Sequence, residues 1–272
     1  MIEFTADKNQ KLSVFLKSQN INLSYANLMK ALRKKDVKIN GVRVNKDVVL
    51  AVGDKVVVYA RVNDVLPYTL IFKDDNVLVI DKPSGFTSET VFESLQKNYN
   101  EIYFIHRLDR NTSGLMIFAL NKDSENELLL GFKNRTFDKR YLCEVYGTVK
   151  DQTKTLTAYL VKDAENSTVK IYDTKVRGGV EIKTGYTVLK QNAKTALLEV
   201  FLYTGKTHQI RAHLAHIGHF IVGDGKYGDN VFNKSQRAKT QRLIAYKLTL
   251  KFTRDSCLYY LNDKTFLSEN KL

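Results

Sequence analysis

The N-terminal part of the chain combines apolar positions at helical spacing with short apolar runs at strand spacing. Two helices are predicted from apolar residues that recur every three or four positions: Leu12, Phe15 and Leu16, then Leu28, Met29 and Leu32 after Ser24, a good N-cap. Two short strands are predicted around the turn Asn40-Gly41, and a third strand over 55–59. Residues 1–60 are therefore expected to form a small α+β module, followed by a linker over 61–68.

From residue 69 the apolar runs become longer and more numerous. The run over 115–120 is unbroken, which predicts a strand buried on both faces. The other predicted strands and helices are a hairpin of 70–72 with 77–80, helices over 89–98 and 124–133, strands over 137–147, 150–195 and 197–203, and a helix from an N-cap at Thr207 to Gly218. We expect one larger domain over 69–272.

A polar loop rich in turn-forming residues precedes the buried run. It contains Asp109 with Arg107 and Arg110 on either side. Nearby cations favour the ionised form of a carboxylate, and an ionised carboxylate can act as a nucleophile or a base. The residues alone leave a second interpretation open, in which Asp109 only caps the loop through a local salt bridge.

The net charge and composition of the chain indicate which kind of molecule it binds. The chain has 272 residues and a formal net charge of +14, which favours a polyanionic partner such as a nucleic acid. Cys143 and Cys257 lie too far apart for a zinc ribbon or a disulfide framework. No apolar run approaches the length of a membrane span, and the first residues lack the pattern of a signal peptide, so we expect a soluble, cytoplasmic protein.

Four of the five histidines lie close together in the sequence, at positions 208, 213, 216 and 219. Helical spacing brings His213 and His216 together, but no carboxylate or cysteine completes a ligand set. We therefore predict no metal site.

The sequence His-Arg-Leu-Asp-x-x-Thr-Ser-Gly-Leu over 106–115 resembles the signature loop of the RluA-type RNA pseudouridine synthases. The resemblance implies that Asp109 is the essential catalytic residue. It also implies that Tyr141, in a Lys-x-Tyr motif, stacks on the target uracil, and that Arg211, in His-Gln-Ile-Arg, pairs with Asp109. Arg107 would fill the gap left by the flipped base. Without the family, Tyr141 would be read as a half-buried strand tyrosine.

Residues 1–60 resemble the small RNA-binding module that many of these synthases share with a small-subunit ribosomal protein. The resemblance implies RNA contacts from Arg33, Lys34, Lys35 and Lys38, which we place at a basic helix end; a solvated basic surface is the alternative. Lys206, which stands where most relatives carry Arg, is a further expected RNA contact, made by an ammonium in place of a bidentate guanidinium.

The fold implied is α+β: a mostly antiparallel, mixed-sheet catalytic domain behind the small module. The implied reaction converts uridine in RNA to pseudouridine without a cofactor. Large-subunit ribosomal RNA is the expected substrate, with transfer RNA second, and we expect a monomer. Two other classes remain open: a non-catalytic RNA-binding protein of the same fold, and a glycoside hydrolase, which would need a second carboxylate.

Overall fold

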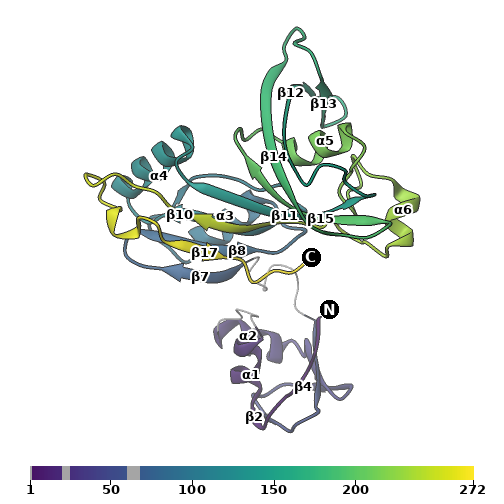
Figure 1. The fold of residues 1–272 in the computed structure, drawn as a ribbon. Helices are drawn as coiled ribbons and strands as arrows, with labels where there is room; N and C mark the ends of the chain where they lie inside the picture. The colour runs from purple at the N-terminus through teal and green to yellow at the C-terminus, as the bar shows by residue number, and fades with distance from the viewer. Residues whose placement is uncertain (1, 20–24, 60–67) are drawn as a thin grey trace. The chain divides into compact units, whose positions relative to one another are not determined.

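The computed structural model describes residues 2–19, 25–59 and 68–272. The chain divides into two compact units, Met1–Thr69 and Leu70–Leu272, each of which is described by itself below. Figure 1 shows the N-terminal unit in purple and the larger unit in blue to yellow. Among the described residues, no helix has the length and apolar character needed to cross a membrane.

The N-terminal unit packs two helices against a four-stranded sheet. Its elements are β1 (Ile2–Thr5), β2 (Gln10–Lys11), α1 (Leu12–Ser18), α2 (Tyr25–Arg33), β3 (Val37–Ile39), β4 (Val42–Val44), β5 (Val49–Leu50) and β6 (Lys55–Val58), with the sheet order β1-β6-β3-β4 and a separate β2-β5 pair. Asn40 and Gly41 both have positive φ, as the tight β3–β4 turn requires, so the predicted hairpin is confirmed. Ser24 and nearly all of the predicted linker lie outside the described residues.

The basic residues of this unit do not share one helix end, contrary to the prediction. Helix α2 ends at Arg33, Lys34 and Lys35 form the turn that follows, and Lys38 belongs to β3. Lys35 has a left-handed backbone, and its amide closes the helix on Leu32. Because the helix closes at Lys35, the chain has already entered strand β3 when it reaches Lys38.

The larger unit is built on one mixed, mostly antiparallel sheet, as predicted. Its strands are β7 (Thr69–Lys73), β8 (Val77–Lys82), β9 (Tyr103–Phe104), β10 (Ser113–Ala119), β11 (Asp138–Tyr146), β12 (Thr153–Asp163), β13 (Thr168–Tyr172), β14 (Val180–Gln191), β15 (Thr195–Leu202), β16 (Leu243–Thr249) and β17 (Thr265–Leu267). The main path runs β13-β12-β14-β15-β11-β16-β10-β8-β7, with β9 beside β10 and β17 beside β16. β10 runs parallel to β16 and antiparallel to β8.

Residues 115–119 of the predicted apolar run lie in β10, every residue of which is buried, and Leu120 follows the end of the strand. Gly114, near its start, has a φ of +117°, and a Cβ there would lie 2.3 Å from the backbone oxygen of Ala245 in β16. Only glycine permits this close approach of the two parallel strands. Gly114 of the signature loop is therefore required for β10 to pair with β16.

Helices cover the sheet at both ends. They are α3 (Ser88–Gln96), α4 (Lys122–Asn134), α5 (Gln209–His216) and α6 (Asn230–Ser235), with a 3₁₀ turn at Tyr259–Leu261. α4 packs on β10, and α5 packs against β13 and β14 at the other end of the sheet (Figure 1). The predicted helices over 89–98 and 124–133 correspond to α3 and α4.

The start of α5 differs from the prediction. Its N-cap is His208, with a left-handed φ of 56°, and not Thr207. The Gln209 side chain explains the shift, because it accepts hydrogen bonds from the Lys206 amide and the Thr204 hydroxyl and so closes the preceding loop. The predicted stop at Gly218 is confirmed, since its φ is +85° and its amide donates to Ala215.

Candidate active site

The loop that carries Asp109 lies between β9 and β10 and is held by the segment 82–88. On one side of Asp109, the Ser88 hydroxyl both accepts from the Leu108 amide and donates to the Leu108 carbonyl, at 2.9 Å each. On the other side, the Arg110 carbonyl accepts from the Gly85 amide at 2.9 Å. These bonds hold the backbone on both sides of Asp109.

Lys82 strengthens this attachment from inside the protein. Its side chain is fully buried, and its ammonium donates to the carbonyls of Pro83, Phe86 and Arg110 at 3.1, 2.9 and 3.1 Å. An ammonium has three donors, and all three are used. Burial lowers the pKa of Lys82 to about 8, and the charges of Asp109 and Asp81 oppose that shift.

Arg211 joins Asp109 to a second, fully buried carboxylate. Its Nη1 donates to Asp109 Oδ2 at 2.9 Å, while Nε and Nη2 donate to Asp224 at 2.7 and 2.9 Å. The side chains of Arg211, Asp109 and Asp224 are 7%, 21% and 0% exposed. The two-bond contact with Asp224 fixes the plane of the guanidinium, so its remaining edge is presented to Asp109.

The electrostatics of this cluster favour its charged form. Burial opposes a charge on Arg211, but hydrogen bonds and charges from Asp224 and Asp109 outweigh it and raise the pKa of Arg211. Burial likewise opposes a charge on Asp224, yet its bonds with Arg211 lower the pKa of that carboxyl. Sequence reasoning missed Asp224; the available signal was a lone acid between two glycines in a segment of 222–228 that matches the family in outline.

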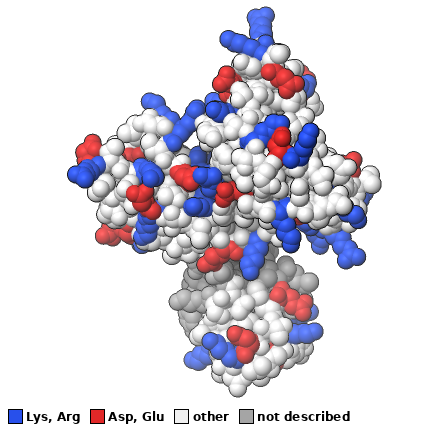
Figure 2. All heavy atoms as spheres, viewed as in Figure 1, with Lys and Arg blue, Asp and Glu red and all other residues white. Residues whose placement is uncertain are grey.

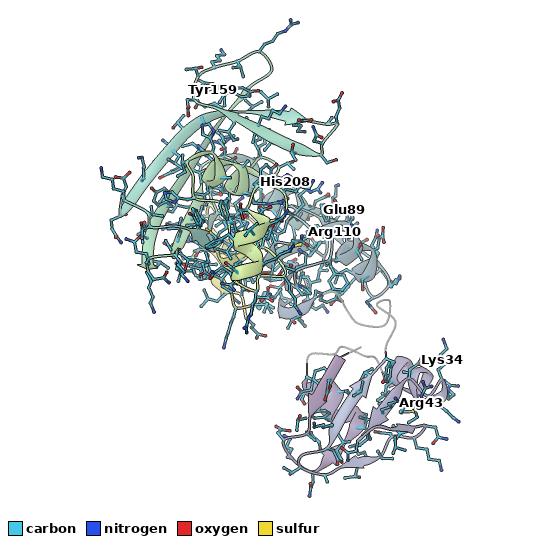
Figure 3. All side chains as sticks on the ribbon, turned by 90° about the vertical axis from the view of Figure 1, so that its right-hand side faces the viewer. Lys34, Arg43, Glu89, Arg110, Tyr159 and His208 are labelled. Carbon is cyan, nitrogen blue, oxygen red and sulfur yellow. The ribbon has the colours of Figure 1, made fainter. Side chains whose placement is uncertain are left out.

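His208 approaches the same carboxylate from the start of α5 (labelled in Figure 3). Its Nε2 lies 3.8 Å from Asp109 Oδ2, and its Nδ1 lies 2.9 Å from the Tyr227 hydroxyl. That hydroxyl also accepts from the Val169 amide at 2.8 Å, so Tyr227 fixes the orientation of the His208 ring. Burial lowers the pKa of His208 and so favours its neutral form. The Nε2 edge of the ring therefore faces Asp109.

These groups open onto a cavity of about 450 Å³. Of the sequence-predicted site residues, it is lined by Asp109, Arg211, Tyr141, Arg107 and Lys206. Tyr141 lies on β11, and burial together with the charge of Asp109 raises its pKa to about 12, so its ring carries a neutral hydroxyl at neutral pH. The cavity has the size of ligand pockets in general, roughly 300–1,000 Å³.

Arg107 and Lys206 stand at the exposed margin of the cavity. Arg107 lies 3.3 Å from Glu89, and both side chains are more than half exposed. Lys206 is exposed in the loop before α5. The predicted RNA-contacting residues Arg33, Lys34, Lys35 and Lys38 belong to the N-terminal unit, where Figure 3 labels Lys34 and Arg43.

The remaining histidines have protein partners. His213 bonds Thr184 at 3.0 Å, His216 bonds Asp173 at 2.8 Å, and His219 bonds the carbonyl of Tyr146 at 3.0 Å. His106 accepts from the Ile117 amide and stacks on Phe132, and burial lowers its pKa to about 3. Within the described ranges, no three His, Cys, Asp or Glu side chains are arranged to hold a metal ion.

Comparison with known proteins agrees with this architecture. The family model described as RNA pseudouridylate synthase matches residues 76–216. The chain is 30% identical over 282 residues to "Ribosomal large subunit pseudouridine synthase C" of Escherichia coli, covering 93% of this chain and 88% of the relative. It is 28% identical over 274 residues to the protein of that name from Vibrio parahaemolyticus, covering 91% of this chain and 86% of the relative.

The fold also matches a solved structure. "Human RNA Pseudouridylate Synthase Domain Containing 1" superposes with a TM-score of 0.61 over 76% of this chain and 91% of that chain, at 23% identity. The family match extends from before β8 to the end of α5 and so includes Asp109, Tyr141 and Arg211. The chain therefore belongs to the RNA pseudouridylate synthase family and is an RNA pseudouridine synthase.

Proposed function

We propose that this enzyme converts specific uridines of large-subunit ribosomal RNA to pseudouridine, with Asp109 as its catalytic carboxylate. The relatives from Escherichia coli and Vibrio parahaemolyticus, matched over most of their length, carry names that specify the large ribosomal subunit. One observation carries the catalytic assignment: Asp109 is the only acidic side chain that lines the cavity of the described residues, and Arg211 holds one of its oxygens.

The contacts suit the chemistry. The N1–C1′ bond of uridine breaks, the uracil turns within the cavity, a C5–C1′ bond forms, and the C5 proton is replaced by one on N1. Asp109 either attacks the nucleoside or removes a proton from it, and both routes require an ionised carboxylate. Arg211 stabilises that form. The described residues hydrogen-bond the Asp109 carboxylate only through Oδ2, which leaves Oδ1 to face the substrate.

The substrate base must leave any RNA helix before it can reach Asp109. Tyr141 is proposed to stack on the uracil, because it offers a neutral ring at the cavity wall beside Asp109. Arg107, which is exposed and paired only with an exposed Glu89, is free to enter the gap left by the base. Lys206 is proposed to meet the RNA at the cavity margin.

The N-terminal unit is proposed to bind RNA through Arg33, Lys34, Lys35 and Lys38. The β3–β4 register adds Arg43, which pairs directly across from Lys38. Two cations opposite each other in a hairpin repel, and an anion between them relieves that repulsion. Sequence reasoning missed Arg43, although the predicted turn at Asn40-Gly41 already set this register.

The test uses ribosomal and transfer RNA from a strain that lacks the enzyme. Wild-type protein is expected to form pseudouridine at defined positions of the large-subunit RNA, and Asp109→Asn is expected to lower turnover by several orders of magnitude while RNA binding persists. Pseudouridine mapping, free-uracil analysis and a binding isotherm provide the readouts. Modification of transfer RNA alone would reassign the substrate, free uracil would indicate a hydrolase, and an active Asn variant would exclude Asp109 as the catalyst.

A further inference from the structure

The charges around the cavity are strongly unbalanced. Its lining contains Asp109 as the single acid among the described residues and six strong bases: Arg107, Lys133, Arg135, Lys139, Lys206 and Arg211. Arg211 is paired with Asp109 and Asp224, and Arg107 with Glu89. On the visible face of the molecule in Figure 2, by contrast, basic and acidic side chains are mixed. The cavity is thus strongly positive within a chain that is basic overall.

Three of the bases come from one short segment, the end of α4 and the start of β11. We call Lys133, Arg135 and Lys139 the α4–β11 wall. No carboxylate of the described residues forms an ion pair with any of the three, although all three line the same cavity as Asp109. Cations that line a cavity and have no ion-pair partner among the described residues are suited to an anionic ligand.

Arg135 occupies a backbone position that normally favours glycine. It is the C-cap of α4, with a left-handed φ of 58°, and its amide donates to Gly131 to end the helix. A side chain at such a position costs about 1 kcal/mol relative to glycine. The Arg135 side chain is exposed, so packing does not explain the use of arginine there. The exposed guanidinium is available for an anionic ligand instead.

Lys139 shows the same lack of a counter-charge. Its ammonium lies 4.7 Å from the centre of the Phe132 ring, at the cavity wall. Burial and the nearby charge of Arg135 lower the pKa of Lys139. An anion bound between the two residues would remove this repulsion and restore the favoured charged form.

We infer that the α4–β11 wall is a binding site for the phosphodiester backbone of the RNA next to the target uridine. The inference rests on the proposed function, because the ligand that enters the cavity is a nucleotide within RNA. Phosphate matches the donors: a planar guanidinium and two ammonium groups, with no acceptor among them. In this arrangement the negative charges of the phosphate and of Asp109 are kept apart, because the phosphate lies against the α4–β11 wall while Asp109 faces the nucleoside.

The experiment compares two variants that lose the same charge. Lys133→Gln/Arg135→Gln/Lys139→Gln removes the wall, and Lys150→Gln/Lys175→Gln/Arg177→Gln removes two lysines and one arginine that are exposed and lie outside the cavity. Affinity for a ribosomal RNA fragment that the wild type binds is measured as a function of salt. Each lost phosphate contact lowers the salt slope by roughly 0.7 for single-stranded RNA. The wall variant is expected to lose about two units and at least tenfold in affinity, and the control less than half a unit.

A single substitution separates binding from folding. Arg135→Gly suits the left-handed backbone, so its melting temperature is expected to equal or exceed that of the wild type. RNA affinity should nevertheless fall by several-fold, and KM should rise by a similar factor. Equal salt slopes for the wall and control variants, or wild-type affinity of Arg135→Gly, would overturn the inference. Because the binding comparison requires no turnover, its outcome is distinct from failure to form pseudouridine on ribosomal RNA.

Discussion

At the scale of single residues, Arg211 is a structural residue as well as a partner of Asp109. It donates two hydrogen bonds to Asp224, whose side chain is fully buried. Removing one member of a buried ion pair costs about 3–5 kcal/mol, because the other charge is left uncompensated. Replacement of Arg211 therefore disturbs the fold and the site together. Asp224 offers a more selective test of how the guanidinium is oriented.

Asp224→Asn should lower turnover by about tenfold or more, since the guanidinium loses the two-bond contact that aims it at Asp109.

Asp224→Asn should also change how the free energy of unfolding depends on pH in the acid range. Arg211 lowers the pKa of Asp224 below its ordinary value of 3.8, so this carboxylate stabilises the fold above that pH and the stabilisation is lost as pH falls through the lower folded value. Urea unfolding between about pH 3 and 7 measures the effect. Identical pH dependence of the wild type and the Asn variant would contradict it.

Tyr227 provides a second test at this scale. Its hydroxyl is hydrogen-bonded to His208 Nδ1 and so holds the Nε2 edge of the ring toward Asp109. Tyr227→Phe removes that hydroxyl, leaving the Val169 amide and Nδ1 without their partner. We expect a loss of roughly 1–3 kcal/mol in the free energy of unfolding and a lower kcat. His208→Gln, which can place an amide donor at the Nε2 position, should retain more activity than His208→Ala; the reverse order of kcat would contradict a role for a hydrogen-bond donor facing Asp109.

At the scale of elements, the turn after β8 and the loop before β10 act as one unit, joined at Arg110 by Lys82. Protonated Lys82 uses three donors for three carbonyls, whereas the neutral amine has only two. Because burial lowers the pKa of Lys82 to about 8, kcat/KM should fall as pH rises through that value. Lys82→Met should show low activity at all pH values. A profile of kcat/KM over about pH 6–10, with exposed Lys150→Met as the control, tests this; an unchanged alkaline limb in Lys82→Met would exclude the assignment.

The basic residues around α2 and β3 predict a salt effect that is independent of the cavity. Replacing Arg33, Lys34, Lys35 and Lys38 with Gln should weaken RNA binding and reduce its salt slope by up to about one unit per lost contact. Turnover of a short, saturating substrate should not change. The control replaces Lys8, Lys11, Lys46 and Lys55, exposed lysines of the same unit. If both sets reduce the slope equally, the four predicted residues are solvated surface without a specific RNA contact.

Sequence patterns predicted elements whose signals are local. The apolar run of β10, the Asn40-Gly41 turn and the stop at Gly218 each depend on a few adjacent residues, and the structure confirms them. The predicted start of α5 at Thr207 was wrong because the actual start depends on the Gln209 side chain, which folds back on its own loop. Asp224 was missed because its partner Arg211 lies on a different element and no pattern encodes their contact. The position of Lys133, Arg135 and Lys139 beside Asp109 was missed because distant segments of the chain come together to form the cavity.

At the scale of the whole molecule, the two units have separate cores. One cluster of buried side chains lies entirely within the N-terminal unit, and the clusters around β10 and α5 lie entirely within the larger one. Residues 68–272 should therefore fold cooperatively without the N-terminal unit. The fragment should modify a short substrate at a kcat close to that of the full chain, with weaker binding of long ribosomal RNA. Thermal unfolding and single-turnover assays test this; an unfolded fragment would show that the cores depend on each other.

The position of β16 has a consequence for synthesis of the protein. This strand lies between β10 and β11, yet it is nearly the last strand of the chain. During translation, β8–β10 and β11–β15 emerge as two half-sheets with open edges facing each other, and only the arrival of residues 243–249 joins them. Exposed strand edges in incomplete chains favour aggregation and proteolysis. A chain that ends before Leu243 would therefore have two incomplete sheets with exposed strand edges. We expect such a chain to aggregate or be degraded, and not to persist as a shorter enzyme.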